Sequence, residues 1–397
     1  MNLADQIIKQ LYFCVYLSVS ELSVLTKKSI PKVTDEVNKL VDGGSLVEVG
    51  FAASTGGRRA MQYALRLENL PHIVTIAIDQ HFTTVAIVDF KNDFVVEPHQ
   101  IASDLYDSED TLLRIVELVQ RLLRQVPKER PFVVGLTMPG FVDHEKGVNR
   151  SFAPESPYYA IKKYLEKTLG LPVQIANDSS AIAIAEHKFG KGKGSQDVLV
   201  VNLNWGVGLG MIIENHLYKG HSGYAGEFSH IPLANAQRLC SCGKKGCLEV
   251  EASLACALDY VHTFLQAEEP SGLQVVWARK GRIELTDLVR AFDAGDQVAI
   301  KAVKKMTHML GKGLATLIHI MNPEKIIISG NGAAFGEGLL PTIQAALQEY
   351  CIPRLARFTE VLVSDIAYVQ VISTACIAVQ QINMYQFQHK QIKLQQL

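Results

Sequence analysis

The sequence predicts an α/β protein of two lobes, preceded by a small domain of three helices and a β-hairpin. Two observations support this fold class. Up to residue 70, apolar residues recur with the helical period in three short segments, and two short strands follow. After residue 71, strands alternate with helices in two successive sets, which is the pattern of layered α/β domains. A chain of 397 residues is long enough for two or three domains.

The composition indicates an ordinary soluble globular protein. Apolar residues make up 48% of the chain, charged residues 20%, and the net charge is −1. No window of about 18 uninterrupted apolar residues predicts a membrane span. The first residues lack the basic and apolar runs of a secretory signal. Since the whole chain is not basic, any contact with nucleic acid must come from a local patch.

The first domain, residues 1–70, has the plan of a winged helix-turn-helix. The expected elements are a helix over residues 4–15, a second helix with Ser20 as its N-cap, a third from the N-cap Ser29 to Gly43-Gly44, and strands at residues 46–49 and 61–67. Pro31 lies in the first turn of the third helix, where its missing N–H costs nothing. A turn at residues 54–57 joins the strands.

On that plan the third helix enters the major groove of DNA, and residues after the hairpin turn reach phosphate or the minor groove. The residues expected to contact DNA are Lys32, Thr34, Asn38, Arg58 and Arg59. The charge signal is weak, because residues 1–70 hold 8 Lys and Arg against 7 Asp and Glu, and Asp35 and Glu36 lie on the same helix. A small protein-binding module therefore stays an alternative.

After residue 71 the strands and helices form two sets. The expected strands lie at residues 73–79, 84–89, 132–137, 173–176, 198–203, 211–213 and 325–329, and the expected helices at 111–125, 158–169 and 181–186. The two sets meet near residue 195. They predict two lobes with a cleft between them.

A cluster of sulfur and imidazole ligands lies in the second set. His230, Cys240, Cys242 and Cys247 fall within eighteen positions, and Gly243 and Gly246 permit the tight turn that would bring them together. Three thiolates and one imidazole are the ligands of a closed structural zinc site. Buried thiols or a disulfide are the alternative. The remaining cysteines are expected to be buried thiols: Cys14, Cys256, Cys351 and Cys376.

These motifs together resemble the ROK family (repressor, open reading frame, kinase), and the resemblance covers essentially the whole chain. The motifs are Met138-Pro139-Gly140, Asn177-Asp178, Gly206-Val207-Gly208, Gly226-Glu227-x-x-His230 and the string Cys240, Cys242, Cys247, Glu249. The resemblance implies an actin/hexokinase-like core behind the winged helix-turn-helix. It implies a small lobe over residues 71–192, rejoined by a C-terminal helix at about 376–397, and a large lobe over 193–375 that carries the zinc site.

The resemblance also implies a sugar site. The residues implied to hold sugar hydroxyls are Asn177, Asp178, Glu227, His230 and Glu249. Carboxylates and amides suit the vicinal hydroxyls of a sugar. In family kinases Asp178 would be the general base. A helix N-cap is the structural alternative for Asp178, and one ring nitrogen of His230 would face the metal while the other faces the sugar.

The phosphate-binding loops depart from the pattern of family kinases. The family pattern Asp-x-Gly-Gly-Thr reads Asp79-Gln80-His81-Phe82-Thr83 here, so both glycines that would let the backbone approach phosphate are replaced. Asn204-Trp205 stands where a Gly-Thr pair is expected. The chain is therefore expected to be a regulator and not an enzyme, with Asp178 a vestigial base.

The resulting interpretation is a cytoplasmic, sugar-responsive transcriptional regulator, a repressor of carbohydrate-use genes. Its expected partners are operator DNA, a sugar or sugar-derivative effector, structural zinc and further copies of itself in a homodimer or homotetramer, with no membrane. Two alternatives stay open. One is an ATP-dependent sugar kinase of the ROK family, and the other is a regulator that binds another protein.

Overall fold

The computed structural model describes residues 2–51, 59–103, 105, 108–127, 130–233 and 237–381. The chain divides into two compact units. Unit 1 comprises Met1–Asp178 and Gln370–Leu397, and unit 2 comprises Ser179–Val369. The chain passes from unit 1 to unit 2 between residues 178 and 179, and back between residues 369 and 370. The sequence predicted these boundaries at 192/193 and 375/376. The described helices include none that is long and apolar enough to cross a membrane.

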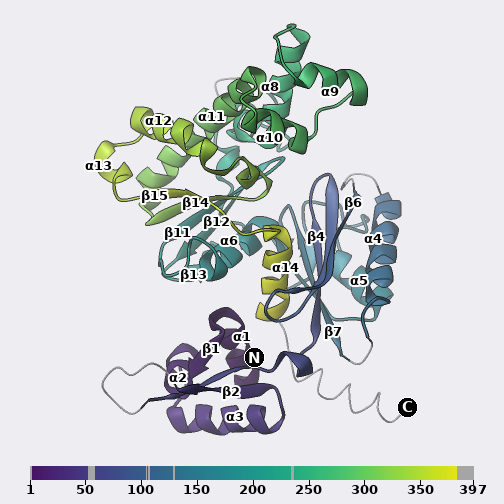
Figure 1. The fold of residues 1–397 in the computed structure, drawn as a ribbon, viewed down its shortest axis with the longest axis vertical. Helices are drawn as coiled ribbons and strands as arrows, with labels where there is room; N and C mark the ends of the chain where they lie inside the picture. The colour runs from purple at the N-terminus through teal and green to yellow at the C-terminus, as the bar shows by residue number, and fades with distance from the viewer. Residues whose placement is uncertain are drawn as a thin grey trace. The chain divides into compact units, whose positions relative to one another are not determined.

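The N-terminal part of unit 1 has the order of a winged helix-turn-helix, as predicted (Figure 1). Its elements are α1 (Leu3–Cys14), β1 (Tyr16–Ser18), α2 (Val19–Thr26), α3 (Ile30–Asp42), β2 (Leu46–Phe51) and β3 (Met61–Leu65). The strands form one sheet in the order β1-β3-β2. The expected turn at residues 54–57 and Arg58 lie outside the described residues.

Local signals explain where these helices begin and end. The predicted N-cap Ser20 is wrong. Ser18 caps α2 instead, because its hydroxyl accepts from the backbone N–H of Glu21 while the Glu21 carboxylate accepts from the backbone N–H of Ser18. Ser29 is the N-cap of α3 as predicted, although its side chain makes no capping hydrogen bond. Gly44, with φ +73°, follows α3 in the left-handed conformation that glycine adopts most easily.

The helix α1 joins this head to the rest of unit 1. Tyr12 is buried, and its hydroxyl donates to Asn92 Oδ1 at 2.6 Å, while its ring meets the Phe90 ring edge-on at 5.8 Å between centroids. The Lys9 ammonium donates to the carbonyl of Gln380 at the end of the C-terminal helix α14 (Val369–Gln380). The head is therefore held by buried contacts in addition to its linker.

The remainder of unit 1 is a five-stranded sheet covered by helices. Its elements are β4 (His72–Ile78), β5 (Phe82–Val88), β6 (Phe94–Ala102), α4 (Ser108–Leu123), β7 (Phe132–Met138), the small hairpin β8 (Val142–Asp143) and β9 (Val148–Asn149), α5 (Ile161–Leu169) and β10 (Val173–Asn177). The strand order is β10-β7-β4-β5-β6. The helices α4 and α5 pack on one face, and α14 packs on the other through Thr137 and Thr374 (Figure 1).

Unit 2 repeats the same sheet topology. Its elements are α6 (Asp178–Phe189), β11 (Val198–Leu203), β12 (Val207–Ile213), β13 (His216–Leu217), α7 (Glu249–Ala252), α8 (Leu254–Gln266), α9 (Leu273–Lys280), α10 (Leu285–Asp293), α11 (Gln297–Met321), β14 (Lys325–Ser329), α12 (Leu340–Tyr350), α13 (Pro353–Ala356) and β15 (Glu360–Val363). The order β13-β12-β11-β14-β15 again joins an antiparallel meander to two parallel strands. This repeat confirms the predicted two-lobed α/β fold.

Two glycines explain how α6 lies so close to this sheet. A Cβ on Gly208 would lie 2.0 Å from Ser179 Oγ, and a Cβ on Gly210 would lie 2.3 Å from Ala183 Cβ. The predicted glycine string at 206–210 is thus mostly part of strand β12, and Gly208 and Gly210 permit helix packing. The face of the sheet opposite α6 carries the larger core, to which α8, α11 and α12 contribute.

Two further expectations are corrected. The helix expected at 158–169 begins at Ile161, because the residues before it form turns. Cys14 is exposed at the end of α1 instead of buried, whereas Cys256, Cys351 and Cys376 are buried as expected. None of the seven cysteines is joined in a disulfide, so the disulfide alternative is not what the fold contains.

Candidate functional site

The cysteine loop of unit 2 folds back on itself through short backbone hydrogen bonds. The backbone N–H of Cys240 donates to the carbonyl of Lys244 at 2.8 Å, and that of Gly243 donates to Cys240 at 2.9 Å. Gly243 and Gly246 have φ values of +83° and +75°, which confirms their expected role in the turn. Arg238 anchors the loop to α8 by an ion pair with Asp259 at 2.5 Å.

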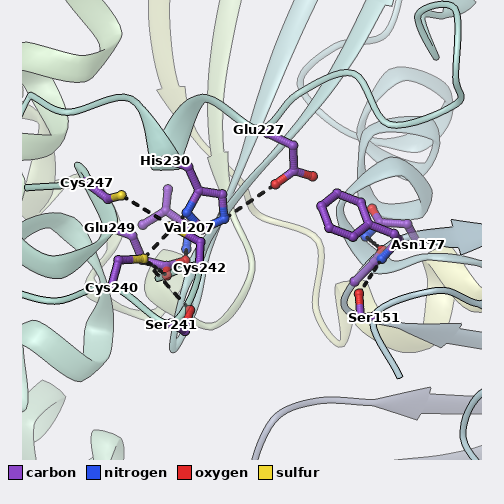
Figure 2. A network of polar contacts seen from close by, with 12 residues as sticks. Ser151, Asn177, Val207, Glu227, His230, Cys240, Ser241, Cys242, Cys247 and Glu249 are labelled. Atoms are coloured by element: carbon purple, nitrogen blue, oxygen red, sulfur yellow. Dashed lines mark hydrogen bonds and ion pairs between the residues drawn. The ribbon is translucent and has the colours of Figure 1, made fainter. Parts of the chain in front are cut away.

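The loop brings the four predicted metal ligands together (Figure 2). One ligand atom from each of His230, Cys240, Cys242 and Cys247 lies within 4.8 Å of all the others. Cys240 Sγ is 3.6 Å from His230 Nδ1, and Cys242 Sγ is 3.6 Å from Cys247 Sγ. Zinc bond lengths of about 2.3 Å to sulfur and 2.0–2.1 Å to nitrogen give tetrahedron edges of about 3.8 Å and 3.6 Å. The cluster therefore fits a tetrahedral metal ion.

Two of the three thiols in this cluster, those of Cys240 and Cys247, hold their protons more tightly than an ordinary cysteine does. Burial raises the pKa of Cys247 to about 12 and also raises the pKa of Cys240. The backbone N–H of Lys244 lowers the pKa of Cys242, which is exposed. A metal ion must therefore displace protons from Cys240 and Cys247, so its affinity falls as the pH falls.

The second ring nitrogen of His230 faces a carboxylate. His230 Nε2 lies 3.5 Å from Glu227 Oε2, while Nδ1 faces the thiols (Figure 2). A carboxylate on the outer nitrogen of a ligating histidine orients its ring. Desolvation raises the pKa of Glu227, the neighbouring His230 opposes the shift and Glu249 adds to it. Half of the Glu227 side chain (51%) is nevertheless exposed, so its carboxylate is open to a ligand from solvent.

Glu249 lies against the cysteine loop. Its Oε1 accepts from Cys240 Sγ at 3.5 Å, and its Oε2 accepts from the backbone N–H of Val207 at 3.4 Å. A Cβ on Gly206 would lie 2.6 Å from the same oxygen. Unit 2 therefore places Glu227 and Glu249 beside the His/Cys cluster to which His230 belongs, and the contact of these three residues with sugar stays a prediction.

The other two predicted sugar ligands belong to unit 1. The Asn177 amide donates to the carbonyl of Gly140 at 3.2 Å, and Gly140 itself has φ +101° in the loop after β7. This loop is the Met138-Pro139-Gly140 motif, which therefore orients Asn177. Asp178 lies in the first turn of α6, where the helix dipole favours a carboxylate. Their roles in ligand binding stay predictions.

Four of the five predicted DNA contacts belong to the described part of the head. Lys32 and Asn38 on α3 are exposed. Thr34 is half-buried, and its hydroxyl donates to the carbonyl of Ile30 at 2.9 Å. Arg59 is exposed just before β3, and Arg58 lies outside the described residues.

Sequence reasoning missed two lysines beside these contacts. Lys27 and Lys28 form the turn between α2 and α3, and both are exposed. Within the described residues, Lys27, Lys28 and Lys32 have no acidic partner, whereas Lys39 pairs with Glu36 at 3.6 Å. The weak net charge of the domain thus hides a local concentration of cations, which the adjacent Lys27-Lys28 pair already signalled in the sequence.

The two loops that would hold phosphate in a kinase have other contacts. Thr83 is fully buried, and its hydroxyl donates to Ser103 Oγ at 2.9 Å. Asp79 accepts from the backbone N–H of Gln80. In unit 2, Trp205 packs against the larger core.

Comparison with known proteins gives one family and several relatives. Residues 74–373 match the model described as the ROK family. The xylose repressor of Caldicellulosiruptor bescii is 26% identical over 335 residues, covering 83% of this chain and 82% of that protein. The DNA-binding transcriptional dual regulator NagC of Escherichia coli is 27% identical over 344 residues, covering 83% of this chain and 80% of that protein.

Solved structures of two kinds are similar to this chain. A ROK family transcriptional regulator, described as a homologue of the E. coli MLC protein, matches with a TM-score of 0.74 at 24% identity and covers 96% of both chains. A ROK family glucokinase from Streptomyces griseus, in complex with glucose and AMPPNP, matches with a TM-score of 0.67 at 27% identity. The glucokinase match covers 78% of this chain and 99% of the enzyme.

Proposed function

Since the chain belongs to the ROK family, we propose that it is a sugar-responsive transcriptional regulator of that family, a repressor of genes for carbohydrate use in the cytoplasm. One observation carries the proposal: a winged helix-turn-helix head precedes a ROK core in the same chain. The family model begins at residue 74, after the head. The glucokinase is almost fully covered while 78% of this chain is matched, so this chain has a substantial part that the enzyme lacks.

The named relatives support a regulator over a kinase. A xylose repressor and the regulator NagC each match over about four fifths of their own length. Two residues support a chain without kinase activity. The hydroxyl of Thr83 is buried and cannot reach a phosphate, and Trp205 has no hydroxyl to donate to one. A coupled assay of ADP release over a panel of sugars tests this point. Turnover of about 1 per second or more would identify a kinase instead.

In this proposal the metal cluster holds structural zinc. The ligands are His230, Cys240, Cys242 and Cys247, whose spacing fits a closed tetrahedral site. Zinc would clamp the cysteine loop up to Cys247, and Glu249 follows two residues later, where the backbone N–H of Val207 donates to its carboxylate. Glu227 would orient His230 from its outer side.

The effector is a sugar or sugar derivative held through its hydroxyls. The proposed ligands are Asn177, Asp178, Glu227, His230 and Glu249. Sugar binding would favour one arrangement of the two units over another and so change how two heads in a homodimer or homotetramer meet DNA. The head would bind operator DNA through Lys32, Thr34, Asn38, Arg58 and Arg59.

The test uses the purified full-length protein and duplex DNA from the region upstream of its own gene. We expect tighter binding to that duplex than to a random one, with affinity that falls steeply as salt rises. Arg59→Ala should weaken binding and flatten the salt dependence, whereas Arg354→Ala, an exposed arginine on α13 of unit 2, should not. Equal affinity for both duplexes at every salt concentration would refute the proposal. A thermal-shift screen with xylose and N-acetylglucosamine then tests for the effector.

A further inference from the structure

The first residue of α3 presents an apolar side chain to solvent. Ile30 is 55% exposed, whereas the apolar residues Val33, Val37 and Leu40 of the same helix are buried in the head. The position at the N-terminus of the second helix of a helix-turn-helix is one that meets base edges in the major groove. An exposed isoleucine at this position is therefore placed to contact base edges and to contribute to recognition of the DNA sequence.

Ile30 belongs to a row of three residues along α3. Ile30, Thr34 and Asn38 are spaced four residues apart, so they lie along one face of the helix. The Thr34 hydroxyl donates to the carbonyl of Ile30 at 2.9 Å, so its proton is not available to a base. The row therefore offers DNA an apolar alkyl group at Ile30 and a hydrogen-bonding amide at Asn38.

Cations flank the beginning of this row. Lys27 and Lys28 lie directly before Ser29, the N-cap of α3, and Lys32 lies in the first turn of the helix. None of the three has an acidic partner among the described residues, so their charges are available to phosphate. Contacts of this kind set the depth and register of a helix in the groove without reading its sequence. They would place Ile30 against the bases.

Thymine is the base that offers an apolar group in the major groove, its C5 methyl. We propose that Ile30 reads the C5 methyl of a thymine in each half-site of the operator, and that it is a specificity-determining residue of the head. Asn38, further along the same row, matches the edge of an adenine. This inference rests on the proposed function, because it needs a head that binds DNA in the major groove.

The experiment uses duplexes that the full-length protein enriches from a randomised pool. Each thymine of an enriched duplex is replaced in turn by deoxyuridine, which removes only the methyl group. At one position in each half-site, affinity should fall about fourfold, the effect of exposing one methyl-sized group. Ile30→Ala should bind the thymine duplex about fourfold more weakly and should no longer distinguish deoxyuridine at that position.

A matched variant separates this effect from a general apolar one. Val24→Ala removes an exposed apolar side chain of α2, which is 77% exposed, and should keep the full sensitivity to deoxyuridine. The melting temperature of Ile30→Ala should stay close to that of the wild type, since more than half of the side chain is exposed. If Ile30→Ala retains the wild-type sensitivity, or if no position is sensitive, the inference is overturned while DNA binding stands. If no duplex is enriched, the proposed function itself fails.

Discussion

Replacing Cys242 by serine should remove the metal and destabilise unit 2. Cys242 is exposed, and its Sγ lies 3.6 Å from Cys247 Sγ, so the substitution deletes one corner of the tetrahedron with little loss of packing. Serine is a poor ligand for zinc at neutral pH, because its hydroxyl keeps its proton. The change in stability therefore reports the metal and not a cavity.

The size of the effect follows from binding linkage. Free zinc at about 1,000 times its dissociation constant stabilises the folded state by about 4.1 kcal/mol. If losing one of four ligands weakens binding about 1,000-fold, the remaining stabilisation is about 0.4 kcal/mol, so the loss is about 3.7 kcal/mol. For a unit the size of Ser179–Val369, each kcal/mol shifts the melting temperature by about 2–4 °C. We expect a decrease of about 7–15 °C.

Elemental analysis and calorimetry together check this prediction. Wild-type protein purified without chelator should carry one zinc per chain, and Cys242→Ser should carry far less. Cys14→Ser, an exposed thiol at the end of α1, is the matched control and should keep both its zinc and its melting temperature. A wild-type protein with no metal, or a Cys242→Ser protein that loses zinc without losing stability, would refute the reasoning.

Further predictions concern the effector, the head and a buried acid. Glu249→Gln should weaken sugar binding by about 1.5–3 kcal/mol in titration calorimetry, because it removes a charged acceptor, while DNA affinity without sugar stays unchanged; full sugar affinity would exclude Glu249 as a ligand. Tyr12→Phe should lower the free energy of unfolding of unit 1 by about 0.5–1.5 kcal/mol, measured by urea denaturation, because the bond to Asn92 is lost; an unchanged value would mean that this bond does not hold the head. Burial raises the pKa of Glu186 above 4.5, so its contribution to stability is present below that pH and is lost as the pH rises through the higher pKa of the folded protein. Glu186→Gln should therefore flatten the decline of stability with pH, and an identical pH profile would show that another group causes it.

Sequence reasoning predicted the clustering of the four His and Cys side chains well because the chemistry is local. Three cysteines and one histidine within eighteen positions, with glycines at the turn, allow few other arrangements, and the structure gathers all four ligand atoms. The order of the head followed from helical periodicity and from Pro31 and Gly43. The cap at Ser18 was missed because Ser20 offers the same chemistry two residues later, and only the reciprocal bonds with Glu21 distinguish them.

By itself the sequence determined the fold class, the residues of the His/Cys cluster and the family to which the chain belongs, because periodicity, residue spacing and motifs are properties of neighbouring residues. Tertiary structure decided what depends on contacts between distant segments. It packed Gly208 and Gly210 against α6. It also formed the hydrogen bond from Tyr12 to Asn92 and the one from Thr83 to Ser103. It also left Ile30 outside the core of the head, since the face of α3 that packs inward carries Val33, Val37 and Leu40 instead.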